Sequence, residues 1–566
     1  MTRLAGSVLS VGRRDGLVLA TAAVVGMIVG LVILGFELLV EDIIHRVESE
    51  RLAIVAIAPA VGLIITALSL RFVGGRTTAS TSDEYIRVFH DRVPRLALRP
   101  WIGRLIGGVA TVGSGGALGL EGPAIYTGAT IGVAVPRWLR RFNHEETRLL
   151  LSAGAAAGIS AIFKTPATGV VFALEAPYTD DVGRRALLPA LVASAAGYST
   201  FVSAFEVIRP NNAGELRDLL VPPLTFNGLN PQLATREIVG AILLGLLAGL
   251  SAWLFAGAVN WVKALADRPL LPRLVVGAAT LGGLALLSEA VYDKPLSSGP
   301  GIAAAEWATD PAFERTVGFL ALLLGIRVVA TLATVGAGGA GGMFIPLAVQ
   351  GILLGQLVGT LIGQSSAELF PIIGEAAFLG AGYRTPLASV MFVAETTASS
   401  NYVIPALIAA AVSQLIRGRS VSRYQRDNRL GHLERRFALP IATVLSTDTL
   451  TVPPDATAAE LVDFHLIGRR EREVPVVDGE HYLGMCGINQ VSDIPRDEWE
   501  HVTVGEIMDT NAVAGRPSWA LRQAVVAMEQ TDAGVLPVTD SEGIFVGVVD
   551  EAQILKLDKI LDETGS

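Results

Sequence analysis

The sequence predicts an α-helical polytopic membrane protein made of two repeated halves and followed by a soluble α/β tandem. First, 51% of its 566 residues are hydrophobic and only 17% are charged, with a mean hydropathy of +0.51. Its 61 glycines suit closely packed membrane helices. Second, residues 17–415 are mostly apolar blocks, whereas residues 417–566 are rich in charge. Third, several motifs recur at a spacing near 220 residues.

The apolar blocks supply the candidate membrane spans. The longer ones are 17–40, 52–70, 102–118, 186–206, 234–262, 272–290, 314–336, 343–363 and 401–416. Shorter ones lie near 124–138, 149–163, 166–177 and 385–396. About 20 residues cross the hydrocarbon, so the short segments are typical of transporters with broken helices. The first block has no cleavage-like site after it, and we expect it to be a retained helix.

Basic residues predict the topology. Three arginines precede the first span and seven lie within residues 417–436. The positive-inside rule then places both termini in the cytoplasm, with an even number of crossings of the plasma (inner) membrane. We expect a membrane domain over residues 1–430, with halves at about 15–210 and 230–430.

A glutamate lies in the glycine-rich run Gly113–Pro123, between two apolar blocks. A carboxylate at membrane depth is costly, so Glu121 is a candidate functional residue. Non-helical backbone at that depth lines a cavity or is buried in protein, and free N–H groups at a helix start bind anions. The alternative is a packing turn with an acid that reaches the membrane surface.

Two repeats support a duplicated domain. The pattern Thr165-Pro166 with Glu175 recurs as Thr385-Pro386 with Glu395, at an offset of 220 residues. The run Gly119–Pro123 has a counterpart in Gly342–Pro346, at an offset of 223. Duplicated halves with broken segments usually hold the substrate where the halves meet.

These motifs resemble those of the CLC family of chloride channels and proton/chloride antiporters. The resemblance rests on Gly113–Gly116, Gly119–Pro123, Gly341–Pro346 and Tyr424, and it spans roughly residues 15–430. It implies two inverted halves, a homodimer, and one chloride pathway in each subunit. Glu121 would be the gate, because its carboxylate would occupy an anion site.

The resemblance also implies the anion-binding groups. Tyr424 would donate its hydroxyl to the central anion, and backbone N–H groups of the two loops would complete the site. The residues concerned are Gly119, Leu120, Gly122, Met343, Phe344 and Ile345. An interfacial aromatic residue is the alternative for Tyr424, because Arg423 and Arg426 flank it.

The serine motif of the family is degenerate in this chain. The corresponding stretch reads Thr77-Thr-Ala-Ser-Thr-Ser-Asp-Glu84. The best register places Ser80 at the anion-coordinating serine, although Thr78, Thr81 or Ser82 could take that role.

The proton path is the second departure. Many antiporters of this family carry an acidic pair after a Pro-x-x-Gly-x-x-Phe segment, and here the pair reads Glu175-Ala176. Glu175 is therefore a proton-path candidate, but alanine supplies no ionisable group where the relay glutamate would be. Asp180 and Asp181 could serve a water-mediated path instead. This favours a passive chloride channel, with proton-coupled antiport as the alternative.

The tail over residues 440–566 contains a second repeat, with copies at about 440–496 and 503–560. Each copy predicts a helix followed by a strand pair, and the tandem resembles a CBS domain pair. Such pairs often bind adenine nucleotides, but strong binding is doubtful here because Asp550 would repel phosphate. The matching positions are Gly487, Gln490, Asp550 and Gln553.

Other functional classes receive little support. No His-Glu-x-x-His or Gly-x-Ser-x-Gly motif appears, and the seven histidines form no metal-like cluster, so we expect no enzyme, metal or nucleic-acid partner. The single cysteine, Cys486, excludes an intrachain disulfide, and we expect an inert buried thiol. A membrane sensor or scaffold without conduction is the remaining alternative to chloride transport.

Overall fold

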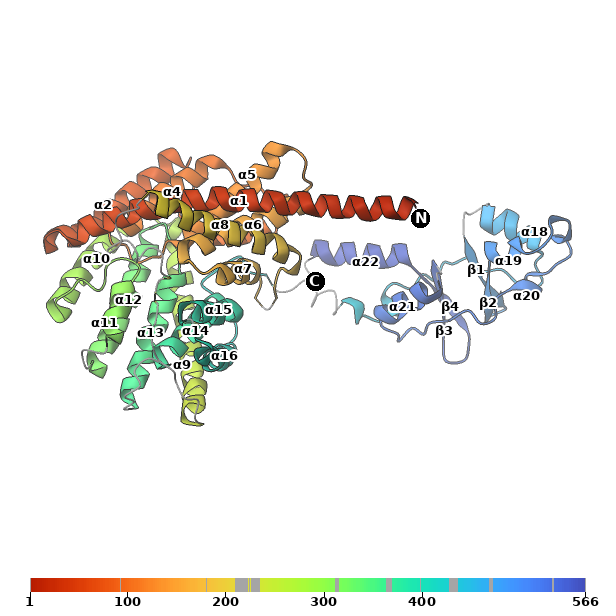
Figure 1. Ribbon diagram of the computed structural model, residues 1–566. Coiled ribbons are helices and arrows are strands. Elements are labelled where there is room, and N and C mark those ends of the chain that lie inside the picture. Colours follow the sequence, from red (N-terminus) through yellow and green to blue (C-terminus); the bar gives the residue numbers. More distant parts are fainter. Residues whose placement is uncertain are drawn as a thin grey trace. The chain divides into compact units, whose positions relative to one another are not determined.

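The computed structural model describes most of the chain as two compact units, Met1–Asp427 and Asn428–Ser566 (Figure 1). It describes residues 2–566 except for 92, 180, 209–221, 223, 225–234, 311–314, 363–368, 398, 427–435, 468–471, 532–533 and 565–566. The expected domain boundary near residue 430 and much of the expected linker at 210–230 lie outside the described residues.

The first half of the membrane unit consists of eight described helices. They are α1 (Thr2–Glu48), α2 (Leu52–Leu68), α3 (Ser82–Phe89), α4 (Leu98–Gly113), α5 (Glu121–Leu139), α6 (His144–Phe163), α7 (Pro166–Glu175) and α8 (Leu187–Ile208). A π-helical turn at Ser69–Val73 extends α2. The glycine-rich run 114–120 separates α4 from α5, because glycine can adopt the backbone conformations that a break between two helices requires.

The second half repeats this series of helices. They are α9 (Thr235–Ala264), α10 (Leu270–Tyr292), α11 (Ile302–Thr309), α12 (Val317–Gly336), α13 (Phe344–Leu361), α14 (Leu369–Tyr383), α15 (Pro386–Thr397) and α16 (Ser400–Ser413). Pro166 and Pro386 each begin a helix, where the missing N–H costs nothing. The residues two positions earlier, Lys164 and Arg384, both adopt a left-handed conformation, with φ of 58° and 60°.

Seven of the described helices are long and apolar enough to cross a membrane. They are Asp15–Glu48, Leu52–Val73, Arg184–Ile208, Glu237–Asp267, Leu270–Tyr292, Val317–Gly336 and Phe344–Leu361. Shorter apolar helices include α7, α14 and α16. Of these, α7 matches the short block 166–177 and α16 matches the block 401–416, whereas no predicted block covers α14. The chain is therefore a multi-pass membrane protein.

Reciprocal contacts between the halves reveal an internal two-fold relation. The N–H of Ala117 donates to Thr334 Oγ1 at 3.0 Å, and the N–H of Ala340 donates to Thr111 Oγ1 at 3.1 Å. Residues 117 and 340, like residues 111 and 334, differ by the repeat offset of 223. A contact that is exchanged in this way requires a two-fold axis between the halves. The predicted pair of inverted repeats is confirmed.

Glycine allows the same close helix crossing in each half. A Cβ on Gly128 of α5 would overlap the carbonyl oxygen of Gly154 in α6, and the reverse holds. Gly351 of α13 and Gly374 of α14 stand in the same relation. Helix backbones that approach this closely are typical of membrane proteins, where dispersion rather than water exclusion drives helix association.

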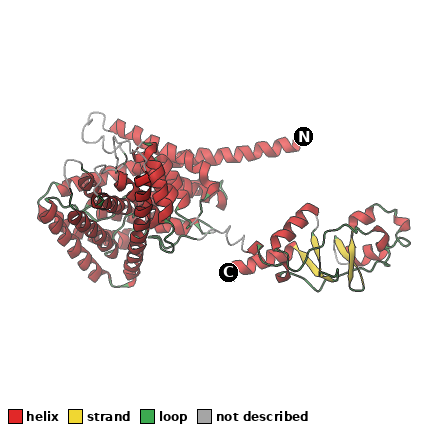
Figure 2. Cartoon of the chain, turned by 90° about the horizontal axis from the view of Figure 1, so that it is seen from below, coloured by secondary structure: helices red, strands yellow, loops and turns green. Residues whose placement is uncertain are grey.

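The second unit contains two short β-hairpins with flanking helices, and Figure 2 shows its strands in yellow. The strands are β1 (Glu473–Asp478), β2 (His481–Gly487), β3 (Val535–Thr539) and β4 (Phe545–Asp550). The helices are α18 (Ala458–Glu460), α19 (Ile488–Ser492), α20 (Val504–Ile507), α21 (Leu521–Thr531) and α22 (Glu551–Thr564).

Each hairpin is antiparallel, with β1 paired to β2 and β3 paired to β4. The hairpins join where the N–H of Tyr482 donates to Gly543 O at 3.2 Å and that of Phe545 donates to Glu480 O at 2.8 Å. Cys486 is free and fully buried in β2. The predicted α/β tandem is therefore present.

Candidate functional site

Glu121 is the first residue of α5, and its side chain is only 1% exposed. Its Oε1 accepts a hydrogen bond from the backbone N–H of Phe344, at 2.5 Å. Phe344 is the first residue of α13, so a carboxylate of one half lies at a helix N-terminus of the other. The N–H groups and the positive end of the helix dipole favour an anion there.

The second carboxylate oxygen of Glu121 is buried and has no hydrogen-bond partner within the described chain. Burying a charge without full compensation is costly. The backbone N–H groups of Ile345 and of Glu121 itself also act on the carboxylate, but Oε2 lacks a hydrogen bond of normal geometry, which suits a side chain that can leave.

The two repeated loops are joined directly by their backbones. The N–H of Gly119 donates to Gly342 O at 2.9 Å, and the N–H of Gly342 donates to Gly119 O at 2.8 Å. The prediction that Gly119 offers a free N–H to an anion is therefore wrong, because that donor is already paired. Leu120 is half-buried at the start of α5, and Gly122 is buried inside it.

Aromatic rings surround the N-terminus of α13. The ring of Phe344 lies 4.6 Å from that of Phe163, 5.2 Å from Phe172 and 5.0 Å from Phe392, between centroids. These rings come from α6, α7 and α15. They keep water away from the Phe344 N–H, and electrostatic interactions strengthen in such low-dielectric surroundings.

Tyr383 supplies a hydroxyl at this loop that the sequence analysis does not name. The N–H of Met343 donates to the Tyr383 hydroxyl at 3.3 Å, and the Tyr383 ring packs edge-on against Phe172. Tyr383 is the last residue of α14 and is 2% exposed. Its place just before the repeated Thr385-Pro386 turn is the one signal in the sequence that marks it.

Tyr424 is 44% exposed and makes no described contact with either loop. It follows α16 in a segment without regular helix, which Gln425 fixes by donating to Ala176 O at 2.9 Å and Tyr383 O at 2.7 Å. Tyr383 rather than Tyr424 places its hydroxyl at the loop, and the role of Tyr424, which lines the same cavity, stays a prediction.

The degenerate serine motif ends where α3 begins. Ser80 is half-buried, and the hydroxyl of Thr81 donates to Gly341 O at 3.1 Å. Ser82 is the first residue of α3, and its Oγ is buried without a partner among the described atoms. Of the hydroxyls considered, that of Ser82 is buried and unpaired, whereas the role of Ser80 stays a prediction.

A cavity of about 750 Å³ adjoins these groups. Ser80, Ser82, Met343, Tyr383 and Tyr424 contribute to its wall. Its charged lining residues are Arg71, Arg76, Asp83, Lys263, Arg268, Arg273 and Arg423. Six of the seven are basic, so the cavity presents a positive potential that concentrates anions.

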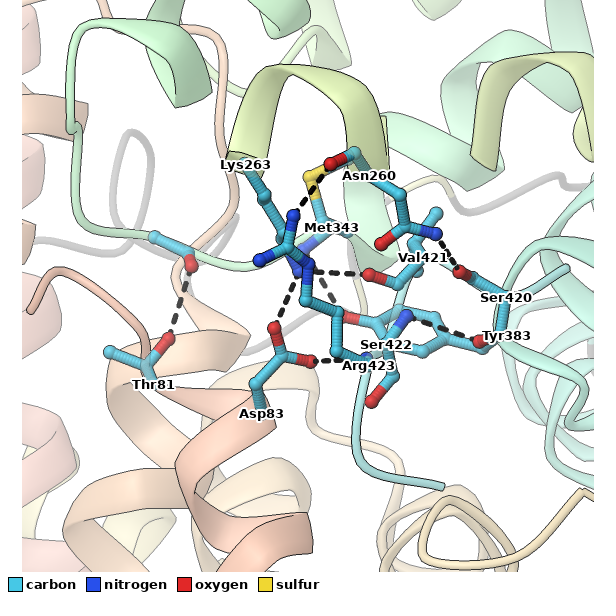
Figure 3. A network of polar contacts seen from close by, with 11 residues as sticks. Thr81, Asp83, Asn260, Lys263, Met343, Tyr383, Ser420, Val421, Ser422 and Arg423 are labelled. Carbon is cyan, nitrogen blue, oxygen red and sulfur yellow. Dashed lines mark hydrogen bonds and ion pairs between the residues drawn. The ribbon is translucent and has the colours of Figure 1, made fainter. Parts of the chain in front are cut away.

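Figure 3 shows the polar network on the wall of this cavity. The ammonium of Lys263 in α9 contacts Asp83 Oδ2 at 2.6 Å and donates to Val421 O at 2.8 Å. The N–H of Arg423 donates to Asp83 Oδ1 at 3.4 Å, and its guanidinium donates to Asn260 O at 2.6 Å. The network therefore ties the segment 420–423 to α3 and α9.

The proton-path candidate Glu175 caps a helix. Its two carboxylate oxygens accept the N–H groups of Leu387 at 3.0 Å and Ala388 at 2.8 Å, at the start of α15. Glu395 does the same for α7, where it accepts the N–H of Ala167 at 2.9 Å and of Thr168 at 2.7 Å. Both acids therefore have a structural function.

The other groups near the expected relay offer no clear replacement. Ala176 is buried and Asp181 is half-buried, whereas Asp180 lies outside the described residues. Glu175 as a proton carrier therefore stays a prediction, and its capping bonds would have to break for it to act.

The predicted nucleotide positions serve as helix caps in the second unit. Gln490 Oε1 accepts the N–H of Gly487 at 3.0 Å, at the start of α19. Asp550 Oδ1 accepts the N–H of Gln553 at 2.6 Å, at the start of α22. Each polar group thus has a partner in its own helix, and adenine-nucleotide binding stays a prediction.

Comparison with known proteins places these features in a family. The family model described as voltage gated chloride channel matches residues 61–418, and a CBS domain matches residues 504–559. A putative chloride channel protein ClcB-like from Ralstonia nicotianae is 28% identical, over 62% of this chain and 80% of its own. The H(+)/Cl(-) exchange transporter ClcA of Citrobacter koseri is 27% identical, over 70% of this chain and 85% of its own.

Solved structures share the fold. A CLC-type fluoride/proton antiporter aligns with a TM-score of 0.61 and 23% identity, over 73% of this chain and 98% of its own. A slow cyanobacterial Cl-/H+ antiporter aligns with a TM-score of 0.61 and 21% identity, over 70% and 93%. A eukaryotic CLC transporter covers 95% of this chain and 97% of its own, with a TM-score of 0.55 and 16% identity.

The family match extends over more than half of the 566 residues and includes both glycine loops, so the resemblance is confirmed. The protein belongs to the voltage-gated chloride channel (CLC) family, whose members carry chloride across membranes as channels or transporters and are not enzymes.

Proposed function

We propose that this chain exchanges chloride for protons across the membrane, with Glu121 as the gate. The observation that carries the proposal is the contact of the Glu121 carboxylate with the Phe344 N–H, at the N-terminus of α13. The carboxylate occupies a place that suits chloride. An arriving anion competes with it, and protonation removes the charge that holds it.

Observations for and against coupling to protons come from the chain and from its relatives. The exchange transporter ClcA, 27% identical, supports exchange, and Glu121 is a carboxylate that can take up a proton. Ala176 in place of a relay acid favours a passive channel, as does the relative named a putative chloride channel. The sequence alone favours the channel, whereas the exchanger's alignment over 85% of its length leads us to propose exchange.

Reconstituted vesicles test coupling directly. The vesicles hold high chloride inside, equal K⁺ on both sides, and valinomycin to keep the voltage at zero. With a more alkaline medium outside, chloride efflux through an exchanger drives protons inward against their gradient, and the outside pH rises. Chloride efflux without proton uptake would establish the channel instead. Absence of efflux above empty vesicles would sink transport and favour the scaffold alternative.

The substitution Glu121→Ala tests the gate. It removes the tethered carboxylate, so we expect chloride efflux to continue at any pH while proton uptake is lost. Glu145→Ala is the matched control, because Glu145 is an exposed acid at the start of α6 and should leave both fluxes unchanged. Proton uptake that survives in Glu121→Ala would contradict the assignment.

The transported anion and the assembly are part of the same proposal. Repeating the efflux assay with fluoride in place of chloride determines the preference between these anions. We further propose a homodimer in the plasma membrane with both termini in the cytoplasm, as the family resemblance implies. Light scattering of the detergent-solubilised chain measures the mass, and a monomer would contradict the dimer.

A further inference from the structure

An ion pair between Lys263 and Asp83 lies on the wall of the cationic cavity. The Lys263 side chain is 21% exposed and that of Asp83 is 9% exposed, with 2.6 Å between Nζ and Oδ2. Asp83 is the one acid among the seven charged residues that line this cavity. It is thus a negative group in surroundings otherwise arranged to attract anions.

The pair lies beside the groups that lead to Glu121. Asp83 follows Ser82, whose buried hydroxyl has no partner among the described atoms, and both residues line the cavity together with Tyr383. Tyr383 accepts the N–H of Met343, the residue before the one that holds Glu121. An anion in the cavity therefore meets Lys263 close to the Tyr383 hydroxyl.

The contact between Asp83 and Lys263 resembles the contact between Glu121 and the Phe344 N–H. In each case a carboxylate of the chain accepts a hydrogen bond from a group that could otherwise bind an anion. The donor differs, because Lys263 offers a full charge on a flexible stem, whereas α13 offers backbone dipoles.

We propose that Lys263 forms a further anion-binding site, which Asp83 occupies until a small inorganic anion such as chloride displaces it. This inference rests on the proposed transport function. Replacement of one anion by another keeps the positive charge of Lys263 compensated, and the other basic residues that line the cavity compensate the displaced Asp83 carboxylate, so that no buried charge is left unpaired. The exchange therefore has a lower cost than binding at an isolated buried group.

Displacement of Asp83 also affects the segment that follows α16. The same carboxylate accepts the N–H of Arg423, and Lys263 donates to Val421 O. An anion on Lys263 therefore leaves the Arg423 N–H without its acceptor. Lys263 would thus couple anion entry to the position of residues 421–423.

Chloride binding to the purified full-length chain in detergent, measured by isothermal titration, tests the site. Asp83→Asn removes the competing charge and keeps the side-chain shape, so we expect chloride to bind at least about tenfold more tightly. Lys263→Gln should lose this binding component, and Lys263→Arg should retain it because the positive charge remains.

The double variant Asp83→Asn with Lys263→Gln has no unpaired charge and tests the origin of the gain. If it binds chloride as tightly as Asp83→Asn alone, the gain does not come from Lys263 and the proposal is overturned. Loss of the gain supports it. Asp42→Asn is the matched control, since Asp42 pairs with Arg46 at an exposed position of α1.

Failure of this site and failure of transport give different results. Wild-type vesicles without chloride efflux would overturn the transport function. Efflux in the wild type, together with unchanged chloride affinity in folded Asp83→Asn and Lys263→Gln, would overturn the Lys263 site alone. Gel filtration shows which variants are folded. If Asp83→Asn or Lys263→Gln fails to fold, Lys263→Arg and the double variant still test the site, because neither leaves an unpaired charge.

Discussion

One residue makes the two paired loops functionally unequal. Glu121 and Phe344 occupy equivalent positions in the repeat, 223 residues apart. The acid therefore accepts an N–H from its own counterpart, and the apolar ring of that counterpart helps to seal the contact. The duplicated scaffold thus has a carboxylate in one loop where the equivalent position of the other loop has an apolar ring.

Tyr383 is buried beside the loops, whereas Tyr424 is partly exposed, and substitutions can distinguish their roles. Tyr383→Phe removes the acceptor of the Met343 N–H, and an unpaired buried donor is costly. We expect the rate of chloride efflux from vesicles to change by roughly tenfold, because the free energy of one such hydrogen bond corresponds to about that factor.

Tyr424→Phe is the matched control for that substitution. Its ring is 44% exposed and far less constrained, so we expect efflux within about twofold of wild type. A larger effect of Tyr424→Phe than of Tyr383→Phe would restore the assignment made from the sequence.

Only part of this site could be predicted from the sequence. Glu121 and the partner loop at Gly342–Pro346 are marked by glycine, proline and the repeat. The contact between Asp83 and Lys263 joins residues 180 positions apart and has no periodic signal. The motif order singles out Tyr424, which lines the cavity, but it gives no sign that Tyr383 accepts the Met343 N–H, because that contact depends on how α14 ends beside α13.

At the scale of elements, α7 and α15 hold each other by exchanged caps. Glu175 at the end of α7 caps α15, and Glu395 near the end of α15 caps α7. Carboxylates at helix N-termini are favourable, and bonds to charged acceptors are the stronger kind.

Because the Glu175 carboxylate caps α15, we expect its replacement by a neutral side chain to lower the stability of the fold. Glu175→Gln keeps one acceptor oxygen but directs an amide donor at a second N–H donor. We expect it to destabilise the fold by about 2 kcal/mol, since a hydrogen bond to a charged group contributes about 1.5–3 kcal/mol. Thermal unfolding followed by tryptophan fluorescence measures the change, with Glu145→Gln as the exposed control. A stable Glu175→Gln that has lost only proton uptake would instead support a proton-carrying role.

The hairpin of β1 and β2 encloses a protected thiol. Burial raises the pKa of Cys486 to about 11, above the ordinary value near 8.5. The folded chain then retains this proton between about pH 8.5 and 11, where the unfolded chain loses it. This contribution to stability is present below pH 8.5 and decreases as the pH rises toward 11.

A thiol reagent such as DTNB measures the protection. At pH 8 we expect Cys486 in the folded full-length chain to react at least about tenfold more slowly than in denaturant, because little thiolate forms and access is blocked. Cys486→Ala is the blank. Equal rates in the two conditions would show that the hairpin opens freely.

The elements themselves were largely predictable. The long apolar blocks appear as α1, α2, α8, α9 and α10, and the gap around Glu121 is indeed a helix break. Helix ends differ most: α1 extends over Thr2–Glu48 rather than 17–40, because polar residues continue a helix once apolar neighbours have started it. The short helix α3 has too little hydrophobic length to stand out as a span.

At the scale of the whole membrane unit, the two-fold relation was foreseeable from the repeats, but its contacts were not. The offsets of 220 and 223 indicate equivalent positions. They do not reveal that Thr111 and Thr334 exchange hydrogen bonds with Ala340 and Ala117, because that requires the halves to be inverted and in register.

The paired backbone at Gly119 and Gly342 restricts how a transport cycle can run. Alternating access by rocking one half against the other would separate these two loops and leave two buried amide groups without partners. We therefore expect the halves to move as one body at their centre. Access from the two sides of the membrane would then change through side chains that swing within a fixed frame, and small excursions of a carboxylate would replace the domain movement that other duplicated carriers use.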